Sequence, residues 1–159
     1  MLELGKAGSH GCPKGTVPVL EDDAVVATLR ASNWREAATA EVGGREWSFR
    51  RVGNRELVGR WAVDPEDAVR VRAHQDSFWR NTWSVQLDRT PVEVASPSWW
   101  KTSRCYRTSG RILAESGTTG RWSPRPTLTV EPGLLLDHAV FLLWFELVLT
   151  RRTAAAAAA

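Results

Sequence analysis

The chain has 159 residues, a length typical of a single domain that can bury a sizeable core. Its hydrophobic content of 43% and charged content of 25% are ordinary for a soluble globular protein. The net charge is +3, and the two cysteines exclude a disulfide framework, so we expect reduced thiols and a cytoplasmic location, with membrane association left open. The first residues lack the apolar core of a signal peptide, so secretion is not expected.

The N-terminal residues 1–20 are rich in Gly, Pro, Ser and Lys. This composition predicts a flexible leader, although residues 16–20 can start a first edge strand. We expect one domain over residues 21–152 and an Ala-rich tail over residues 153–159, which either extends a helix or frays.

The long middle of the chain, from Ala24 to Val130, alternates apolar and polar residues with period two. Trp47 and Phe49 share one side of such a strand, and turn residues recur about every eight to twelve positions. Gly43-Gly44 is a strong two-residue hairpin signal. The pattern predicts a mainly β protein, an antiparallel meander closed into a barrel, in which we count nine or ten strands.

A different pattern follows in Leu134–Leu149, LLLDHAVFLLWFELVL, which is apolar on every side of a helical wheel. We predict a helix over residues 133–152. A helix of this kind must be buried, either in a core or in a membrane. The acids Asp137 and Glu146 favour the core, because charges inside a bilayer are costly.

We therefore expect the barrel to wrap around this C-terminal helix. The helix residues expected in the core are Leu135, Phe141, Leu142, Trp144, Phe145 and Glu146. A buried Glu146 then needs an arginine or a pair of hydrogen-bond donors. The alternative is a tail-anchored membrane protein that uses residues 134–149 as its anchor.

A resemblance to the Tubby C-terminal-like superfamily is carried by two segments, AEVGGREWSFRRVGNRELVGRW (Ala40–Trp61) and LLLDHAVFLLWFELVLTRR with its alanines (Leu134–Ala159). This superfamily includes Tubby, the phospholipid scramblases and the LURP-one-related proteins, and the chain resembles a small branch of actinobacterial type. The resemblance covers most of residues 24–152 and implies a barrel of about twelve strands around a helix. It implies no specific ligand, since neither the phosphoinositide-binding residues of Tubby nor the scramblase calcium site has a matching position here.

Catalytic signatures are not found in the sequence: it has no phosphate loop, dinucleotide motif, zinc-protease motif or nucleophile elbow. We expect no enzyme activity, metal or cofactor, and no specific nucleic-acid partner. His138 reads as a satisfied core histidine, and His74 with Asp76 as a turn pair. The acids of residues 64–67 read as a solvated turn.

One surface-like group lies in a basic zone between residues 101 and 125, which holds six bases and one acid. We select it as the candidate ligand site: Trp99, Trp100, Lys101, Arg104 and Arg107. An exposed Trp beside cations suits an anionic lipid interface or a peptide groove. The alternatives are that both rings are covered, and that the bases form a solvated strand face. The leading hypothesis is a non-enzymatic module that binds anionic lipid head groups or a protein partner. A hydrolase with an unrecognised site is the weakest alternative.

Overall fold

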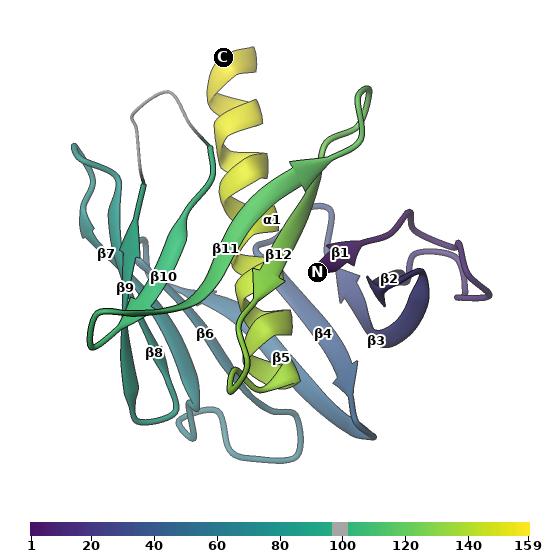
Figure 1. Ribbon diagram of the computed structural model, residues 1–159, viewed down its shortest axis with the longest axis horizontal. Helices are drawn as coiled ribbons and strands as arrows, with labels where there is room; N and C mark the ends of the chain where they lie inside the picture. Colours follow the sequence, from purple (N-terminus) through teal and green to yellow (C-terminus); the bar gives the residue numbers. More distant parts are fainter. Residues whose placement is uncertain (97–101) are drawn as a thin grey trace.

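The computed structural model describes residues 1–96 and 102–159. Within them, twelve strands precede one C-terminal helix (Figure 1). The elements are β1 (Leu2–Leu4), β2 (Val17–Glu21), β3 (Ala24–Ala31), β4 (Ala37–Val42), β5 (Arg45–Val52), β6 (Glu56–Trp61), β7 (Val71–Ser77), β8 (Thr82–Leu87), β9 (Thr90–Ala95), β10 (Cys105–Thr108), β11 (Arg111–Thr119), β12 (Arg125–Val130) and α1 (Leu136–Ala158).

The strands form a closed barrel in which each strand pairs antiparallel with its neighbours in the sequence. β1 closes the ring, because it pairs with β12 at Leu2↔Leu128 and with β2 at Leu4↔Val19. Gly43 and Gly44 both have positive φ, at 57° and 77°, and join β4 to β5 in a tight hairpin. The predicted fold class, an antiparallel barrel around a C-terminal helix, is confirmed.

Two expectations for the N-terminal part are wrong. Residues 1–20 are not a flexible leader, because they supply β1 and most of β2, and the barrel closes only through β1. The barrel therefore contains more strands than the nine or ten we counted. A three-residue strand is too short to show a period of two, which is why the alternation in the sequence did not predict β1.

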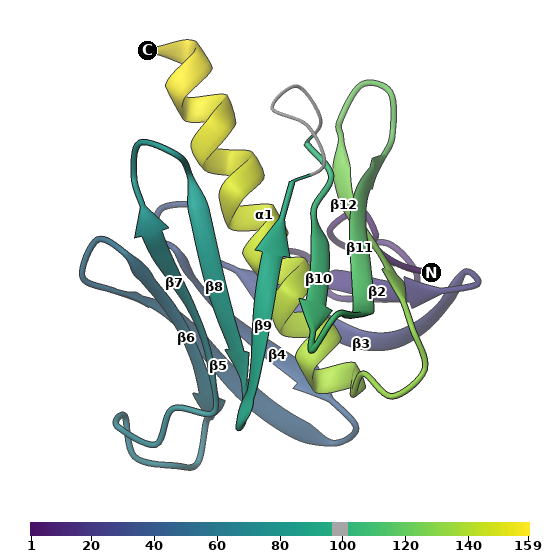
Figure 2. The same ribbon diagram turned by 60° about the vertical axis from the view of Figure 1, so that its left-hand side comes forward.

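The helix runs through the barrel, as the views in Figures 1 and 2 agree. Its buried face contacts the aromatic side chains of the strands: Phe49 stacks on Trp144 with ring centroids 5.3 Å apart, and Trp83 meets Phe145 edge-on at 5.1 Å. Five of the six expected core residues of the helix are buried, namely Phe141, Leu142, Trp144, Phe145 and Glu146. The apolar run needs no polar stripe because the strands surround it.

The ends of the helix differ from the prediction. The helix begins at Leu136 rather than near residue 133, so Leu135 is its N-cap residue and is exposed, not in the core. It continues through Ala158, so the alanines after Thr153 are helical, in keeping with the high helix propensity of Ala. In the described part of the chain, no helix combines the length and apolarity that a membrane crossing requires.

The barrel has two distinct ends. We call the end where the last turns of α1 emerge the exit end, and Figures 1 and 2 show the β7–β8 and β11–β12 hairpins beside it. Because consecutive strands are antiparallel, the β3–β4, β5–β6 and β9–β10 connections belong to this end as well. The opposite end, where α1 begins, we call the start end.

Candidate anion-binding site

A cleft of about 1030 Å³ extends from the C-terminal half of α1 at the exit end to Glu66 in the β6–β7 connection of the start end. Its inner boundary includes the core residues Phe49, Trp144 and Val148, each of which is at most 2% exposed. It extends over the rim to Ser48 and Arg50, which point outward because they alternate with the buried Trp47 and Phe49. We call it the rim cleft.

The rim cleft is strongly cationic. Seven arginines against two glutamates leave its lining with a formal net charge of +5. The glutamates are Glu36 and Glu66, and the arginines are Arg30, Arg35, Arg50, Arg51, Arg60, Arg151 and Arg152. A concave surface lined by one sign of charge concentrates ligands of the opposite sign.

Glu36 organises the inner part of this cleft. Its carboxylate accepts hydrogen bonds from Arg152 Nε at 2.5 Å and Nη2 at 2.8 Å, and from Arg51 Nη1 at 3.1 Å. Burial acts to raise the pKa of Glu36, but the hydrogen bonds and charges of Arg152 and Arg51 outweigh it and hold that pKa below its ordinary value. One carboxylate thus fixes two guanidinium groups and leaves an excess of positive charge.

Arg50 and Arg60 have no such partner. Arg60 Nη1 donates to three backbone carbonyls of the β6–β7 connection, the shortest at 2.8 Å to Asp64 O, and Arg50 reaches only Glu66 O at 3.5 Å. Among the described residues, the buried Nε–H groups of both arginines lack an acceptor. An unmet buried donor costs roughly 1–3 kcal/mol, so both arginines are held in place at a cost, and neither pairs with a carboxylate side chain among the described residues.

A second cleft of about 660 Å³, which we call the side cleft, lies on another side of α1 at the exit end. The β5–β6 and β7–β8 hairpins border it, with Phe78 on its lining, and it shares Arg51 and Arg152 with the rim cleft. Arg55 and Arg104 complete its four arginines, and the described lining residues include no acid. The two clefts together surround the emerging helix with positive charge.

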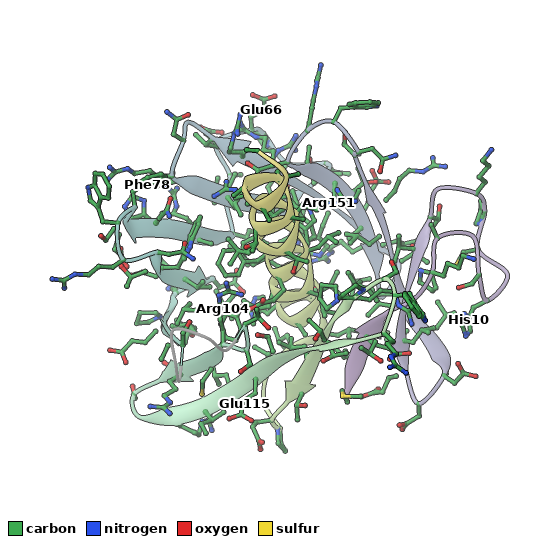
Figure 3. All side chains as sticks on the ribbon, turned by 90° about the horizontal axis from the view of Figure 1, so that it is seen from above. His10, Glu66, Phe78, Arg104, Glu115 and Arg151 are labelled. Carbon is green, nitrogen blue, oxygen red and sulfur yellow. The ribbon has the colours of Figure 1, made fainter. Side chains whose placement is uncertain are left out.

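Glu146 lies beneath the side cleft, and its carboxylate accepts hydrogen bonds from two side chains. Arg104 Nη1 donates to its Oε2 at 2.7 Å, and the Tyr106 hydroxyl donates to its Oε1. The expectation that a buried Glu146 needs an arginine or a pair of donors is met, because Arg104 and Tyr106 are the two donors and one of them is an arginine. Figure 3, which looks onto the exit end, shows Arg104 beside the helix. Glu146 is therefore a structural residue that attaches β10 to α1.

Tyr106 is fully buried in this cluster. Burial, followed by the negative charge of Glu146 and their hydrogen bond, raises the pKa of Tyr106 well above its ordinary value, against the lowering effect of Arg104. The hydroxyl therefore keeps its proton and remains a donor.

The candidate ligand site chosen from the sequence is not assembled as expected. Trp99, Trp100 and Lys101 lie outside the described residues. Arg104 points inward to Glu146, and Arg107 lines neither cleft, since its Nε donates to Cys105 Sγ at 3.3 Å. Strand alternation alone does not reveal that an arginine at the start of a strand turns to a buried helix carboxylate.

The functional residues that sequence reasoning missed are the arginines of the rim cleft. A local signal existed, because Arg50-Arg51 and Arg151-Arg152 are both adjacent pairs. In each pair, the second residue contacts Glu36. Their convergence depends on tertiary structure, since Arg152 lies 116 positions from Glu36.

His74 and His138 each lie beside a carboxylate. His138 Nε2 lies 2.9 Å from Asp88 Oδ2, which confirms a satisfied core histidine. His74 lies 3.4 Å from Glu56 rather than forming the expected pair with Asp76. Over residues 1–96 and 102–159, His, Cys, Asp and Glu side chains form no cluster that could hold a metal ion.

Comparison with known proteins gives no relative: no protein-family model, curated protein or solved structure matches the chain. The functional argument therefore comes from the site itself.

Proposed function

We propose that this protein is a non-enzymatic binding module that holds a multiply charged anion, such as the head group of an anionic lipid, in the rim cleft. The observation that carries the proposal is the excess of five positive charges in one cleft, where Arg50 and Arg60 reach only backbone carbonyls and no carboxylate among the described residues. Arginine suits this task, because its planar fork of donors matches phosphate and carboxylate oxygens.

A barrel of twelve strands around a helix is the fold that the Tubby-like resemblance implies, and on that support we propose membership of this superfamily.

The test is isothermal titration calorimetry of the whole chain with inorganic tripolyphosphate, at low and at raised salt. We expect Arg50→Gln to weaken binding about tenfold or more, since a hydrogen bond to a charged group contributes about 1.5–3 kcal/mol. Arg89→Gln is the matched control, because it removes the same charge from an exposed turn at the start end.

Two results would contradict the proposal. One is the absence of tripolyphosphate binding by the unmodified protein. The other is an equal loss of affinity in both variants, because that would trace binding to net charge rather than to the rim cleft.

A further inference from the structure

We propose that the exit end is a membrane-docking face, on which three tryptophans enter the interfacial layer of an anionic bilayer. The inference rests on the proposed function only in taking the arginines around α1 as the groups that attract the anionic surface.

The tryptophans of the chain fall into contrasting sets. Trp34, Trp79 and Trp122 are 95%, 93% and 94% exposed, whereas Trp47 and Trp144 are buried in the core. Each exposed ring lies in a hairpin connection of the exit end: β3–β4, β7–β8 and β11–β12 respectively. A large apolar ring with one polar N–H is the side chain that gathers where membrane meets water.

The three hairpins are evenly spaced around the barrel. In the ring order, one other exit-end hairpin separates each from the next, since β5–β6, β9–β10 and β1–β2 alternate with them. Three anchors spaced in this way form a tripod around the emerging helix. An extended surface such as a bilayer suits anchors that are spread around one end of a barrel, whereas a protein partner typically recognises one contiguous patch.

The β7–β8 hairpin shows the pattern most fully. Phe78 and Trp79 are both exposed and contact each other edge-on, with centroids 5.9 Å apart, and Arg80 follows them. Figure 3 places Phe78 at the outer edge of the exit end, away from the helix. Adjacent aromatic and cationic side chains suit the boundary between acyl chains and anionic head groups.

The last turns of the helix add a run of small apolar side chains at the centre of the tripod. Residues 154–159 are all alanine and exposed, and α1 continues through Ala158 beyond the strands, as Figures 1 and 2 show. Arg151 and Arg152 lie just below these alanines, at the level of the clefts.

The charges of the two ends would orient the protein. At the exit end we compare the β3–β4, β5–β6, β7–β8, β9–β10 and β11–β12 connections. Their described residues include five arginines and one acid: Arg35, Arg55, Arg80, Arg104, Arg121 and Glu36. At the start end we compare the β4–β5, β6–β7, β8–β9, β10–β11 and β12–α1 connections. These carry five acids and two arginines: Asp64, Glu66, Asp67, Asp88, Glu131, Arg70 and Arg89. An anionic surface attracts one end and repels the other, so the exit end arrives first.

The experiment is flotation with vesicles of phosphatidylcholine alone and of equal parts phosphatidylcholine and phosphatidylglycerol. We expect binding to the mixed vesicles, and a loss of about tenfold for each Trp→Ser substitution at positions 34, 79 and 122, where tenfold corresponds to about 1.4 kcal/mol. Val63→Ser is the matched control, because Val63 is 89% exposed in the β6–β7 connection of the start end.

Two further readouts separate this inference from the proposed function. The double variant Trp79→Ser/Trp122→Ser should bind tripolyphosphate as the unmodified protein does, because neither ring lines the rim cleft. Its thermal unfolding should also be unchanged, because both rings are solvent-exposed. Brominated phosphatidylcholine in the mixed vesicles should quench the tryptophan emission of the unmodified protein and leave that of the triple Trp→Ser variant unquenched.

The inference is overturned if the unmodified protein does not float with the mixed vesicles, or if the triple variant floats equally well. It is also overturned if Val63→Ser loses as much binding as the single Trp variants. A loss of tripolyphosphate binding in Arg50→Gln with flotation intact would support the rim cleft and the tripod as separate contacts. Absence of tripolyphosphate binding with Trp-dependent flotation would contradict the proposed function alone.

Discussion

Substitution of Arg104 by Met tests the cluster that joins β10 to the helix. The change removes the guanidinium 2.7 Å from Glu146 and retains most of the side-chain volume. Glu146 is then a carboxylate with a 6% exposed side chain and one remaining side-chain donor, the Tyr106 hydroxyl. Removing one partner of a buried pair typically costs about 3–5 kcal/mol.

The structure places the expected cost at the lower end, about 3 kcal/mol, because Arg104 borders the side cleft and water can approach the space that it leaves. For a chain of this size, that corresponds to a fall in Tm of about 6–12 °C. Substitution of the other partner, Glu146→Gln, should lower the free energy of unfolding by only about 1 kcal/mol, since the freed guanidinium can turn into the side cleft.

Urea unfolding followed by tryptophan fluorescence measures both single variants and the double variant Arg104→Met/Glu146→Gln. The double variant should regain about 2 kcal/mol relative to Arg104→Met, because Gln still accepts from Tyr106 and carries no charge. Equal effects of the two single substitutions, or no recovery in the double variant, would refute the reasoning.

Three other predictions concern groups described above. The single tyrosine, Tyr106, has its pKa raised in the folded state, so its contribution to stability is complete below pH 10 and is lost as the pH rises further. Tyrosinate absorbance should therefore appear only on unfolding, and urea titrations should show a smaller alkaline loss of stability for Tyr106→Phe than for the unmodified protein. Glu36 has its pKa lowered, so its contribution is present above its unfolded pKa near 4.5 and is lost as the pH falls through the folded value; urea titrations from neutral to acid pH should show a smaller loss for Glu36→Gln than for the unmodified protein. Gly59→Ala should destabilise the protein by about 1–3 kcal/mol, since a Cβ there would lie 2.6 Å from Val71 Cγ2 and 2.7 Å from Phe49 Cδ1. Gly53→Ala tests backbone strain instead, because no atom lies within 4 Å of the added Cβ but φ is +60°. Thermal unfolding compares the two variants.

The fold could be read from the sequence to the extent that it depends on local periodicity. The alternation around Trp47 and Phe49 and the glycine pair before them reflect strand and turn geometry within a few residues. The all-apolar run from Leu134 required enclosure, and the period-two strands offered an inner face for it. Local reasoning also showed that Glu146 needed partners.

The site could not be read in the same way, because it depends on which strands meet. Arg30, Arg50, Arg60 and Arg151 come from four elements that only the closed barrel brings to one cleft. Alternation shows that Arg50 points outward, yet it does not show that the β6–β7 connection lies near it. A positive charge on a strand face looks the same in sequence whether it meets solvent, a carboxylate or a ligand.

The closure of the barrel through β1 has a consequence for how the chain folds. Leu2 and Leu128 are paired at the seam although they are 126 positions apart, and α1, the segment that fills the interior, comes later still in the chain. A sheet that closed without its helix would have no apolar filling. We therefore expect the helix to take its place before the three residues of β1 complete the ring. Such late, long-range pairing is typical of β proteins that fold in about milliseconds to seconds. The seam that closes last is also the shortest pairing in the ring, so we expect it to open first when the protein unfolds.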